Sequence, residues 1–358
     1  MATITKKIIG VSMTIAVLFG GSSYEHEISI VSAITMKKVF KHNQLKFIFV
    51  DSNRAFYAID THNMKSKYFA SGEYTKAKKL SLDSKGFSFS TFLGSKTFDC
   101  DVFLNLIHGR DGEDAKIASL MEFYGLPYIS PRIEASVLSY NKLYTKHFAR
   151  EVGVMTLEYQ HLHKNDKREL KLELPVIVKP SRLGSSIGVS IVKTQEALDY
   201  ALDVAFELDS DVIMEPFVEG IKEYNLAGTK TDRWELSLIE EPQKEAFLDF
   251  DKKYMDFARD TQVLQASINE SLKAKLHESF KRIYDPLFLG SIIRCDFFVV
   301  DDNVYLNEIN PIPGSMANYL FDDFEMMVER LAQHLPKEKP IAISYQYIHS
   351  IQQAKGKA

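Results

Sequence analysis

Cysteine and tryptophan are scarce in this chain, which has 358 residues but only two cysteines and one tryptophan. Cys100 and Cys295 cannot build a disulfide framework, and neither belongs to a Cys-x-x-Cys metal motif. This pattern is typical of a protein from a reducing compartment. A run of about 20 apolar residues is also missing, so we expect no membrane-spanning helix. We therefore expect a cytoplasmic protein that does not bind a membrane.

An excess of charge of one sign is missing as well. The chain has 44 Lys and Arg residues against 48 Asp and Glu residues, for a net charge of −4. Such a balance provides no basic field for nucleic acid, so any phosphate site must be local. Hydrophobic residues at 45% and charged residues at 26% are ordinary for a globular protein. This composition excludes a disordered, collagen-like or coiled-coil chain.

The N-terminal region has two possible interpretations. Lys6 and Lys7 followed by the apolar run 8–19 resemble a signal peptide. However, the run continues into a glycine pair and an amphipathic helix pattern, which is typical of a buried parallel strand that ends at a binding loop. We favour the strand, at residues 15–19.

The remaining pattern predicts an α/β fold followed by α+β units. Residues 15–130 alternate short apolar runs with helix patterns, which predicts a parallel sheet with ligands at the carboxyl ends of its strands. We interpret residues 62–96 as an irregular segment. Later strands are expected at 175–180, 189–192, 212–217, 292–300 and 304–309, and helices at 141–151, 194–207, 267–287 and 324–334, before a frayed tail at 352–358. These units predict three domains, 1–131, 132–220 and 221–358.

The segment 292–310 predicts a hairpin with a polar face. If residues 301–303 form a three-residue loop, Asp296 lies opposite Glu308 and Arg294 lies opposite Asn310. Cross-strand pairs and alternate residues share a face of a sheet, so these four side chains would lie together. Two carboxylates and an amide oxygen are ligands that Mg²⁺ prefers, and an arginine beside them would stabilise a transferring phosphoryl group.

This hairpin also has alternatives. A two-residue loop would place Asp296 opposite Ile309 and separate the four polar side chains. The polar face could also be an ordinary exposed surface with salt bridges.

A loop rich in glycine and serine occupies residues 179–188, between two expected strands. Its backbone N–H groups and hydroxyls could close over a polyphosphate, and Lys179 could reach a phosphate oxygen. The same loop contains a Gly-x-Ser-x-Gly pattern around Ser186, which is a hydrolase motif when a helix follows the serine. Here the sequence continues as a strand, which argues against a hydrolase. A flexible hairpin without a ligand remains the other alternative.

Four further segments carry candidate site residues. Glu25 lies in a loop between a strand and a helix, where it could hold a substrate ammonium or only stabilise the helix dipole. His108 lies in another loop at a strand end, although a lone histidine is more often structural. Residues 215–225 could receive an adenine edge, with Glu223 on ribose hydroxyls, or form an interdomain linker. Lys142, taken alone, is typical of a solvated charge.

Taken together, eight segments in order resemble the D-alanine–D-alanine ligases of the ATP-grasp superfamily. The resemblance extends from residue 15 to about residue 334. The segments are VLFGGSSYEHEIS (17–29), IHGRDGED (107–114), SYNKLYTK (139–146), IVKPSRLGSSIGV (177–189), EPFVEGIKEYN (215–225), FDKKYMD (250–256), RCDFF (294–298) and NEINPIPG (307–314).

The resemblance implies a three-domain ATP-grasp architecture with an N-terminal, Rossmann-like parallel-sheet domain and ATP between the second and third domains. It implies that ATP phosphorylates the carboxylate of one D-alanine to an acyl phosphate, which the amine of a second D-alanine attacks. The dipeptide would serve peptidoglycan precursor synthesis. We also expect a cytoplasmic homodimer. The alternatives are another carboxylate–amine ligase of this superfamily and a nucleotide-binding protein without catalysis.

The resemblance also implies residue roles. ATP would be bound by Lys142, Lys179, Glu215, Phe217, Val218 and Glu223, and two Mg²⁺ or Mn²⁺ ions would be bound by Asp296, Glu308 and Asn310. A lid would be closed by Glu25, Ser185 and Tyr254, and an oxyanion would be stabilised by Arg294 and the N–H of Gly314. The substrates would be contacted by His108, Lys253 and Tyr319.

Tyr319 is the main departure from the family pattern, which has a serine there in most members. Prolines flank Ile312 and stiffen the approach to this segment. We therefore expect the phenol of Tyr319 to turn away from the second D-alanine, leaving its carboxylate to Lys253.

Overall fold

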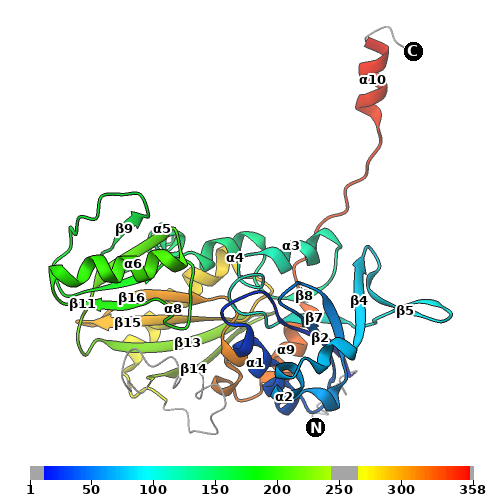
Figure 1. Ribbon diagram of the computed structural model, residues 1–358, viewed down its shortest axis with the longest axis horizontal. Helices are drawn as coiled ribbons and strands as arrows, with labels where there is room; N and C mark the ends of the chain where they lie inside the picture. The colour runs from blue at the N-terminus through cyan, green and yellow to red at the C-terminus, as the bar shows by residue number, and fades with distance from the viewer. Residues whose placement is uncertain (1–11, 243–264, 355–358) are drawn as a thin grey trace, which may run out of the picture.

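The fold is built on three β-sheets. The computed structural model describes residues 12–242 and 265–354 (Figure 1). Its first sheet has eight strands in the order β6-β5-β4-β3-β2-β1-β7-β8, and the other two have four strands each, β11-β10-β12-β9 and β14-β13-β15-β16. Figure 1 shows the second and third sheets at one end of the molecule and the first sheet at the other. Among the described residues, no helix has both the length and the apolar character needed to cross a membrane.

The centre of the first sheet has the parallel order that the sequence predicts. β1 (Thr14–Gly20) pairs in parallel with β2 (Gln44–Val50) and β7 (Val102–Asn105), and β7 pairs in parallel with β8 (Tyr128–Ile129). The apolar run 15–19 is buried in β1, so its interpretation as a strand is confirmed. The helices that follow the strands are α1 (His26–Val39) and α3 (Lys116–Phe123).

The expectation of an irregular segment at 62–96 is wrong. This segment extends the first sheet with antiparallel strands, so the whole sheet is mixed and not purely parallel. The sequence carries no clear alternation of apolar and polar residues here, because these edge strands are mostly exposed and β6 is fully exposed. The elements are β3 (Phe56–Ile59), η1 (Thr61–Asn63), α2 (Ser66–Ala70), η2 (Glu73–Lys76), β4 (Lys78–Asp83), β5 (Gly86–Thr91) and β6 (Gly94–Thr97).

The second sheet is wholly antiparallel. Its strands are β9 (Gln160–His163), β10 (Val176–Pro180), β11 (Ser190–Val192) and β12 (Asp211–Pro216), and its core includes Val178 and Leu202. β9 lies outside the strands that the sequence predicts. The helices of this region are α4 (Ile133–Tyr140), α5 (Lys142–Glu151), η3 (Gln195–Ala197) and α6 (Leu198–Leu208).

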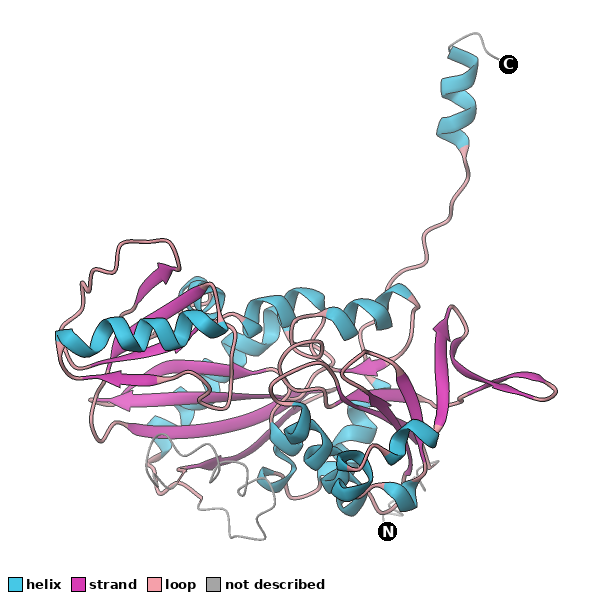
Figure 2. Ribbon diagram, viewed as in Figure 1, coloured by secondary structure: helices cyan, strands magenta, loops and turns pink. Residues whose placement is uncertain are grey.

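The third sheet is also antiparallel, with β13 (Lys222–Lys230), β14 (Trp234–Glu240), β15 (Ile293–Val300) and β16 (Asn303–Asn310). Figure 2 shows these long strands together. α8 (Glu270–Leu287) packs Phe280 and Tyr284 into the same core as Phe297. The interpretation of 215–225 as a linker is therefore wrong from residue 222 onward, because β13 pairs with β14 and β15.

The C-terminal segment returns to the first sheet. After η4 (Gly314–Leu320), α9 (Phe324–Gln333) packs Met327 and Leu331 into the core that contains Phe40. α10 (Gln346–Ala354) stands away from the body on an extended segment (Figure 1), so the predicted fraying is wrong for residues 352–354. The remainder of that tail, 355–358, lies outside the described residues.

Glu325 anchors α9 to the turn between α1 and β2. Its carboxylate accepts backbone hydrogen bonds from Lys41 and His42, both at 2.9 Å, and from Asn43 at 2.8 Å. Partial burial opposes ionisation, but these N–H donors hold the pKa of Glu325 below its ordinary value.

We expect Glu325→Gln to lower the free energy of unfolding by about 2 kcal/mol, because an amide oxygen cannot replace both carboxylate oxygens. This difference in the free energy of unfolding should have its full size above the ordinary pKa of 4.5. It should shrink as the pH falls through the lowered pKa of the folded state. Urea unfolding across pH measures both effects. Glu270→Gln, at an exposed site, is the control, and an equal loss in both variants would contradict the anchoring role.

Candidate active site

Glu25 joins the loop after β1 to the glycine-rich loop of the second sheet. Its carboxylate is buried and accepts a hydrogen bond of 2.6 Å from Ser185 Oγ. Glu25 occupies the N-cap position of α1, but its side chain makes no capping hydrogen bond there. Burial raises the pKa of Glu25, and the charge of Glu113 adds to the shift. Such a carboxylate would gain from a cationic partner such as an ammonium group.

Two glycines make room for this carboxylate. A Cβ at Gly109 would lie 2.6 Å from Glu25 Oε2, and the backbone there has φ +66°, a left-handed conformation that favours glycine. A Cβ at Gly184 would lie 3.1 Å from Glu25 Oε1. Side chains at these positions would therefore displace the carboxylate or the loop.

The glycine-rich loop closes through strained backbone. Ser185 and Ser186 both have positive φ values, 53° and 59°, which non-glycine residues rarely adopt. The chain then continues into β11, and no helix follows Ser186. The hydrolase alternative is therefore excluded, as the sequence predicts. The strain is stored where the loop meets Glu25, which is typical of a functional loop.

His108 lies in the neighbouring loop after β7 and is buried. Its Nε2 is 2.9 Å from Ser32 Oγ of α1, and its Nδ1 is 3.8 Å from Glu113 Oε1. The structure thus brings His108 close to the carboxylates of Glu25 and Glu113. Ser32 and Glu113 were not among the residues that the sequence pointed to.

A buried ion cluster occupies the inner end of the second sheet. Glu215 in β12 forms ion pairs with Lys179 of β10, at 2.6 Å, and with Lys146 of α5. Lys146 was missed by the sequence reasoning. The spacing could have indicated it, because Lys142 and Lys146 are four residues apart on one helix and therefore lie on the same side.

The two lysines keep Glu215 ionised. Burial opposes ionisation of Glu215, but the charges of Lys179 and Lys146 outweigh it and lower its pKa to about 2. Burial also opposes the charge on Lys179, yet Glu215 raises the pKa of Lys179 overall. For Lys146 burial prevails, and its pKa is lowered. Lys179 is thus held as a fixed cation, and its Nζ also donates to Asn307 Oδ1 of β16 at 3.3 Å.

The loop of the β15–β16 hairpin is shorter than predicted, but Asp296 still lies opposite Glu308. The loop has two residues, Asp301 and Asp302, both with positive φ. The expectation of a three-residue loop is therefore wrong. A two-residue loop alone would have placed Asn307, and not Ile309, opposite Asp296. A β-bulge between the Phe297–Leu306 and Asp296–Glu308 pairs adds one residue to β16 and restores the predicted register.

The four polar side chains consequently share one face. Arg294 forms a bidentate pair with Asp296, at 2.7 and 2.8 Å, and Asn310 Nδ2 donates to Asp296 at 2.9 Å. Glu308 lies 3.9 Å from Lys142 Nζ. Burial raises the pKa of Asp296, and although Arg294 opposes this, the charge of Glu308 adds to it. The alternative of an ordinary exposed face is wrong for Asp296, which is buried.

The turn after this hairpin is left-handed. Ser315, Met316 and Ala317 have φ values of 48°, 54° and 51°, although none is glycine. Tyr319 follows this turn. Partial burial raises the pKa of its phenol, and the charge of the nearby Arg294 opposes that shift. The expectation that Tyr319 turns away from the second D-alanine stays a prediction.

The remaining expected residues lie around this site or outside the described residues. Phe217 and Val218 directly follow β12, and Val218 is exposed. Glu223 lies in β13, and its charge contributes to the raised pKa of Lys179. Lys253 and Tyr254 lie outside the described residues.

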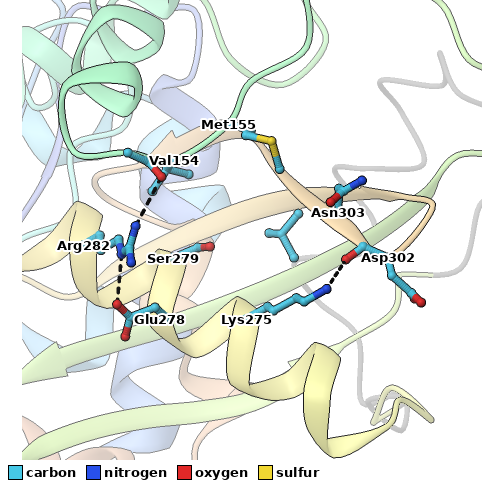
Figure 3. Close-up of a pocket in the computed structure, with 10 residues that line it drawn as sticks. Val154, Met155, Lys275, Glu278, Ser279, Arg282, Asp302 and Asn303 are labelled. Atoms are coloured by element: carbon cyan, nitrogen blue, oxygen red, sulfur yellow. Dashed lines mark hydrogen bonds and ion pairs between the residues drawn. The ribbon is translucent and has the colours of Figure 1, made fainter.

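A separate cavity of about 250 Å³ lies at the turn of the β15–β16 hairpin (Figure 3). Lys275 Nζ donates to the carbonyl oxygen of Asp302 there, at 2.8 Å, and Arg282 Nη1 donates to that of Gly153, at 3.4 Å. The expected site residues do not line it. The cavity therefore does not belong to the candidate site.

This arrangement suits phosphoryl transfer to a carboxylate. Lys142 and Lys179 of the second unit meet the carboxylate face of the third sheet, while Glu25 of the first sheet contacts the glycine-rich loop. Fixed cations and a closing loop stabilise a transferring phosphoryl group and exclude water from it. Fold and site together have the features expected of an ATP-grasp carboxylate–amine ligase.

Family comparisons agree with this class. Models for the D-ala D-ala ligase N-terminus and C-terminus match residues 14–131 and 148–330. The chain therefore belongs to the D-alanine–D-alanine ligase family.

Individual relatives give the same result. A D-alanine–D-alanine ligase of Sulfurovum sp. (strain NBC37-1) is 67% identical over 346 residues, which span 97% of this chain and 100% of that protein. The D-alanine–D-alanine ligase of Wolinella succinogenes is 58% identical over 96% of this chain and 100% of its own length. The crystal structure of the Helicobacter pylori enzyme is 50% identical, covers 91% of this chain and 100% of its own, and has a TM-score of 0.82.

The activity follows from family membership. The chain is an enzyme that joins two D-alanines in an ATP-dependent reaction, and the family implies a role in peptidoglycan synthesis. The alternative of a binding protein without catalysis is set aside.

For the buried ion cluster, we expect Glu215→Gln to lower the free energy of unfolding by about 3–5 kcal/mol, because two buried ammonium groups lose their counter-charge. Removing one of those ammonium groups in the double variant Lys146→Met/Glu215→Gln should recover part of the loss. Asp285→Asn, which breaks a half-exposed pair with Lys230, should cost about 1 kcal/mol or less. Urea unfolding compares the variants, and equal losses for Glu215→Gln and Asp285→Asn would contradict the cluster's importance.

Proposed function

We propose that ligation proceeds through an acyl phosphate at the junction of the three sheets. The observation that carries the proposal is the meeting of Lys142 and Lys179 with the face of β15 and β16 that holds Asp296 and Glu308. Cations on one side and carboxylates on the other suit a nucleotide polyphosphate that enters with divalent ions. The carboxylate of the first D-alanine would attack the terminal phosphorus and displace ADP.

The nucleotide would lie between the second and third sheets. Lys142 and Lys179 would contact its phosphates, and Glu215 would keep Lys179 charged and in place through their 2.6 Å ion pair. The strand end after β12, with Phe217 and Val218, would receive the adenine. Glu223 in β13 would bind the ribose hydroxyls.

The face formed by Asp296, Glu308 and Asn310 fits divalent cations. Two carboxylates and an amide supply hard oxygen ligands. Burial raises the pKa of Asp296, and the neighbouring charge of Glu308 adds to the shift. Two Mg²⁺ or Mn²⁺ ions bound there would neutralise phosphate charge as it develops.

Substrate binding would begin at Glu25. Its carboxylate would hold the ammonium of the first D-alanine, and Ser185 would keep the glycine-rich loop closed over it through their hydrogen bond. His108 would lie beside the same substrate. From the family resemblance alone, we also propose that Tyr254 helps to close this loop and that Lys253 lies near the second carboxylate.

Peptide bond formation would take place beside Arg294. The amine of the second D-alanine would attack the acyl carbon, and the oxyanion would be stabilised by Arg294 and the Gly314 N–H before phosphate leaves. Because the charge of Arg294 acts on the phenol of Tyr319, we propose, in place of the expectation that it turns away, that this phenol contacts the second carboxylate.

We further propose the domain boundaries 1–131, 132–220 and 221–358. Each sheet lies within one of these ranges, which supports them, although α9 of the third domain packs into the first. A cytoplasmic location is proposed because the reaction uses ATP. A homodimer that binds neither nucleic acid nor membrane remains a prediction.

Isotope transfer tests the acyl phosphate. With D-alanine labelled by ¹⁸O in its carboxylate, we expect each turnover to move one labelled oxygen into inorganic phosphate, because the C–O bond of the acyl phosphate breaks on attack. Mass spectrometry of the phosphate gives the answer, and unlabelled phosphate would overturn the proposal.

The same assay includes Glu308→Gln, which should lower kcat by about a hundredfold or more at unchanged fold. Glu278→Gln, on α8, is the control. Near-normal turnover in a folded Glu308→Gln protein would contradict the metal assignment.

Tyr319→Phe keeps the ring and removes only the hydroxyl that we propose as a ligand of the second carboxylate. We expect the KM for the second D-alanine to rise about tenfold, since a hydrogen bond to a charged group is lost, while the KM of the first changes little. Tyr200→Phe, exposed on α6, is the control. Steady-state kinetics at varied D-alanine separates the two constants, and no change in the second would show that the phenol is not a ligand.

A further inference from the structure

Ser32 lies at the centre of α1 and is fully buried. Its hydroxyl contacts two segments that are remote in the sequence. Ser32 Oγ is 2.9 Å from His108 Nε2 in the loop after β7, and it accepts a 3.0 Å hydrogen bond from the backbone N–H of Ser315. One hydroxyl therefore links the proposed first-substrate histidine to the turn that carries Gly314.

Counting protons fixes the direction of one of these bonds and favours one direction for the other. The Ser315 N–H can only donate, so Ser32 Oγ accepts there and keeps its own proton for another partner. Among the hydrogen bonds of the described residues, the partner that remains for that proton is His108 Nε2, which can accept it only when the ring proton is on Nδ1. We therefore infer the Nδ1–H tautomer, in which Nδ1–H faces Glu113 Oε1 at 3.8 Å.

The turn on the other side needs an anchor. Ser315, Met316 and Ala317 are all left-handed without being glycine, a conformation that persists only when its surroundings impose it. The Ser315 N–H bond to Ser32 is a buried contact at the first of these residues. Gly314, whose N–H is the proposed oxyanion donor, is the residue immediately before it.

We propose that Ser32 is a positioning residue that couples the His108 imidazole to the oxyanion turn. Because Ser32 is fully buried, it would act through His108 and the Ser315 amide. It orients the imidazole as an Nδ1–H tautomer and holds the Ser315 amide, and thereby the Gly314 N–H, in place. The role of Gly314 and His108 in this coupling rests on the function proposed above.

Ser29 offers a matched control on the same helix. It is also fully buried, and its hydroxyl likewise makes two hydrogen bonds, accepting from the Gly20 N–H at 2.8 Å and donating to the Leu106 carbonyl oxygen at 2.6 Å. Neither bond involves His108 or the turn at 314–317. Ser29→Ala therefore reproduces the structural loss without the proposed coupling.

Steady-state kinetics provides the first test. We expect Ser32→Ala to lower kcat by about tenfold to a hundredfold, because a displaced oxyanion donor loses its effect steeply with distance. The KM for ATP should change by less than about threefold. Ser29→Ala should show a similar fall in Tm with kcat within about threefold of wild type. Equal kcat values for the two variants would overturn the proposal.

The histidine tautomer provides a second test that does not use activity. In protein labelled with ¹⁵N-histidine at pH about 8, above the usual histidine pKa, long-range ¹⁵N–¹H spectra should show His108 as the Nδ1–H tautomer. His108→Gln assigns its signals. Ser32→Ala should lose this preference, and Ser29→Ala should keep it. An Nε2–H tautomer in wild type would overturn the proposal.

Two further variants keep the tests decisive. Ser32→Cys fills almost the same volume with a weak donor. Its kcat and its fraction of the Nδ1–H tautomer should lie between those of wild type and Ser32→Ala. It replaces Ser32→Ala if that protein does not fold. Glu25→Gln tests the site itself. If Glu25→Gln is inactive and Ser32→Ala behaves as Ser29→Ala, only the coupling is wrong, whereas full activity of Glu25→Gln would contradict the proposed site.

Discussion

The carboxylate face of the third sheet depends on one extra residue in β16. Side chains alternate across a strand, so a shift of a single residue would move Glu308 and Asn310 to the opposite face. The two-residue turn at Asp301 and Asp302 creates that shift, and the bulge before Glu308 reverses it. Bulges next to active sites commonly re-aim side chains in this way. Here the bulge also leaves Asn307 in reach of Lys179, so the correction of register coincides with the contact between two sheets.

Charge within the site is balanced before any substrate binds. Glu215 pairs with Lys146 and Lys179, and Arg294 pairs with Asp296. Each partner is largely removed from water, so leaving one of them alone would be costly. Glu308 lies 3.9 Å from Lys142 Nζ, and Glu25 accepts the hydrogen bond from Ser185. With Asp296, these are the carboxylates that we assign to cationic ligands.

The three units of the chain interlock around this site. The glycine-rich loop of the second sheet reaches Glu25 of the first, and the segment after the third sheet returns to α1 through Ser315 and to the α1–β2 turn through Glu325. α1 is therefore contacted from several sides. A displacement of α1 would therefore move both the loop that contains His108 and the turn that contains Gly314.

Much of the fold and of the candidate site could be predicted from the sequence, because the patterns that indicate them lie within short segments. Alternating apolar runs and helix patterns predicted the central strands, and eight ordered motifs pointed to the family. The shared face of Asp296 and Glu308 was also predicted, although through a loop of the wrong length. The edge strands at 78–97 were missed because exposed strands carry little hydrophobic period, and β13 was missed in part because its sequence was interpreted as a linker.

Tertiary structure alone decided the contacts between distant segments. Lys146 of α5 pairs with Glu215 of β12, and Lys142 of the same helix lies 3.9 Å from Glu308 of β16. Ser32 joins His108 and Ser315 across 76 and 283 residues of sequence. Local patterns specify which face a side chain occupies on its own helix or strand. Which partner meets that face depends on how the elements pack, and that packing is a property of the whole chain.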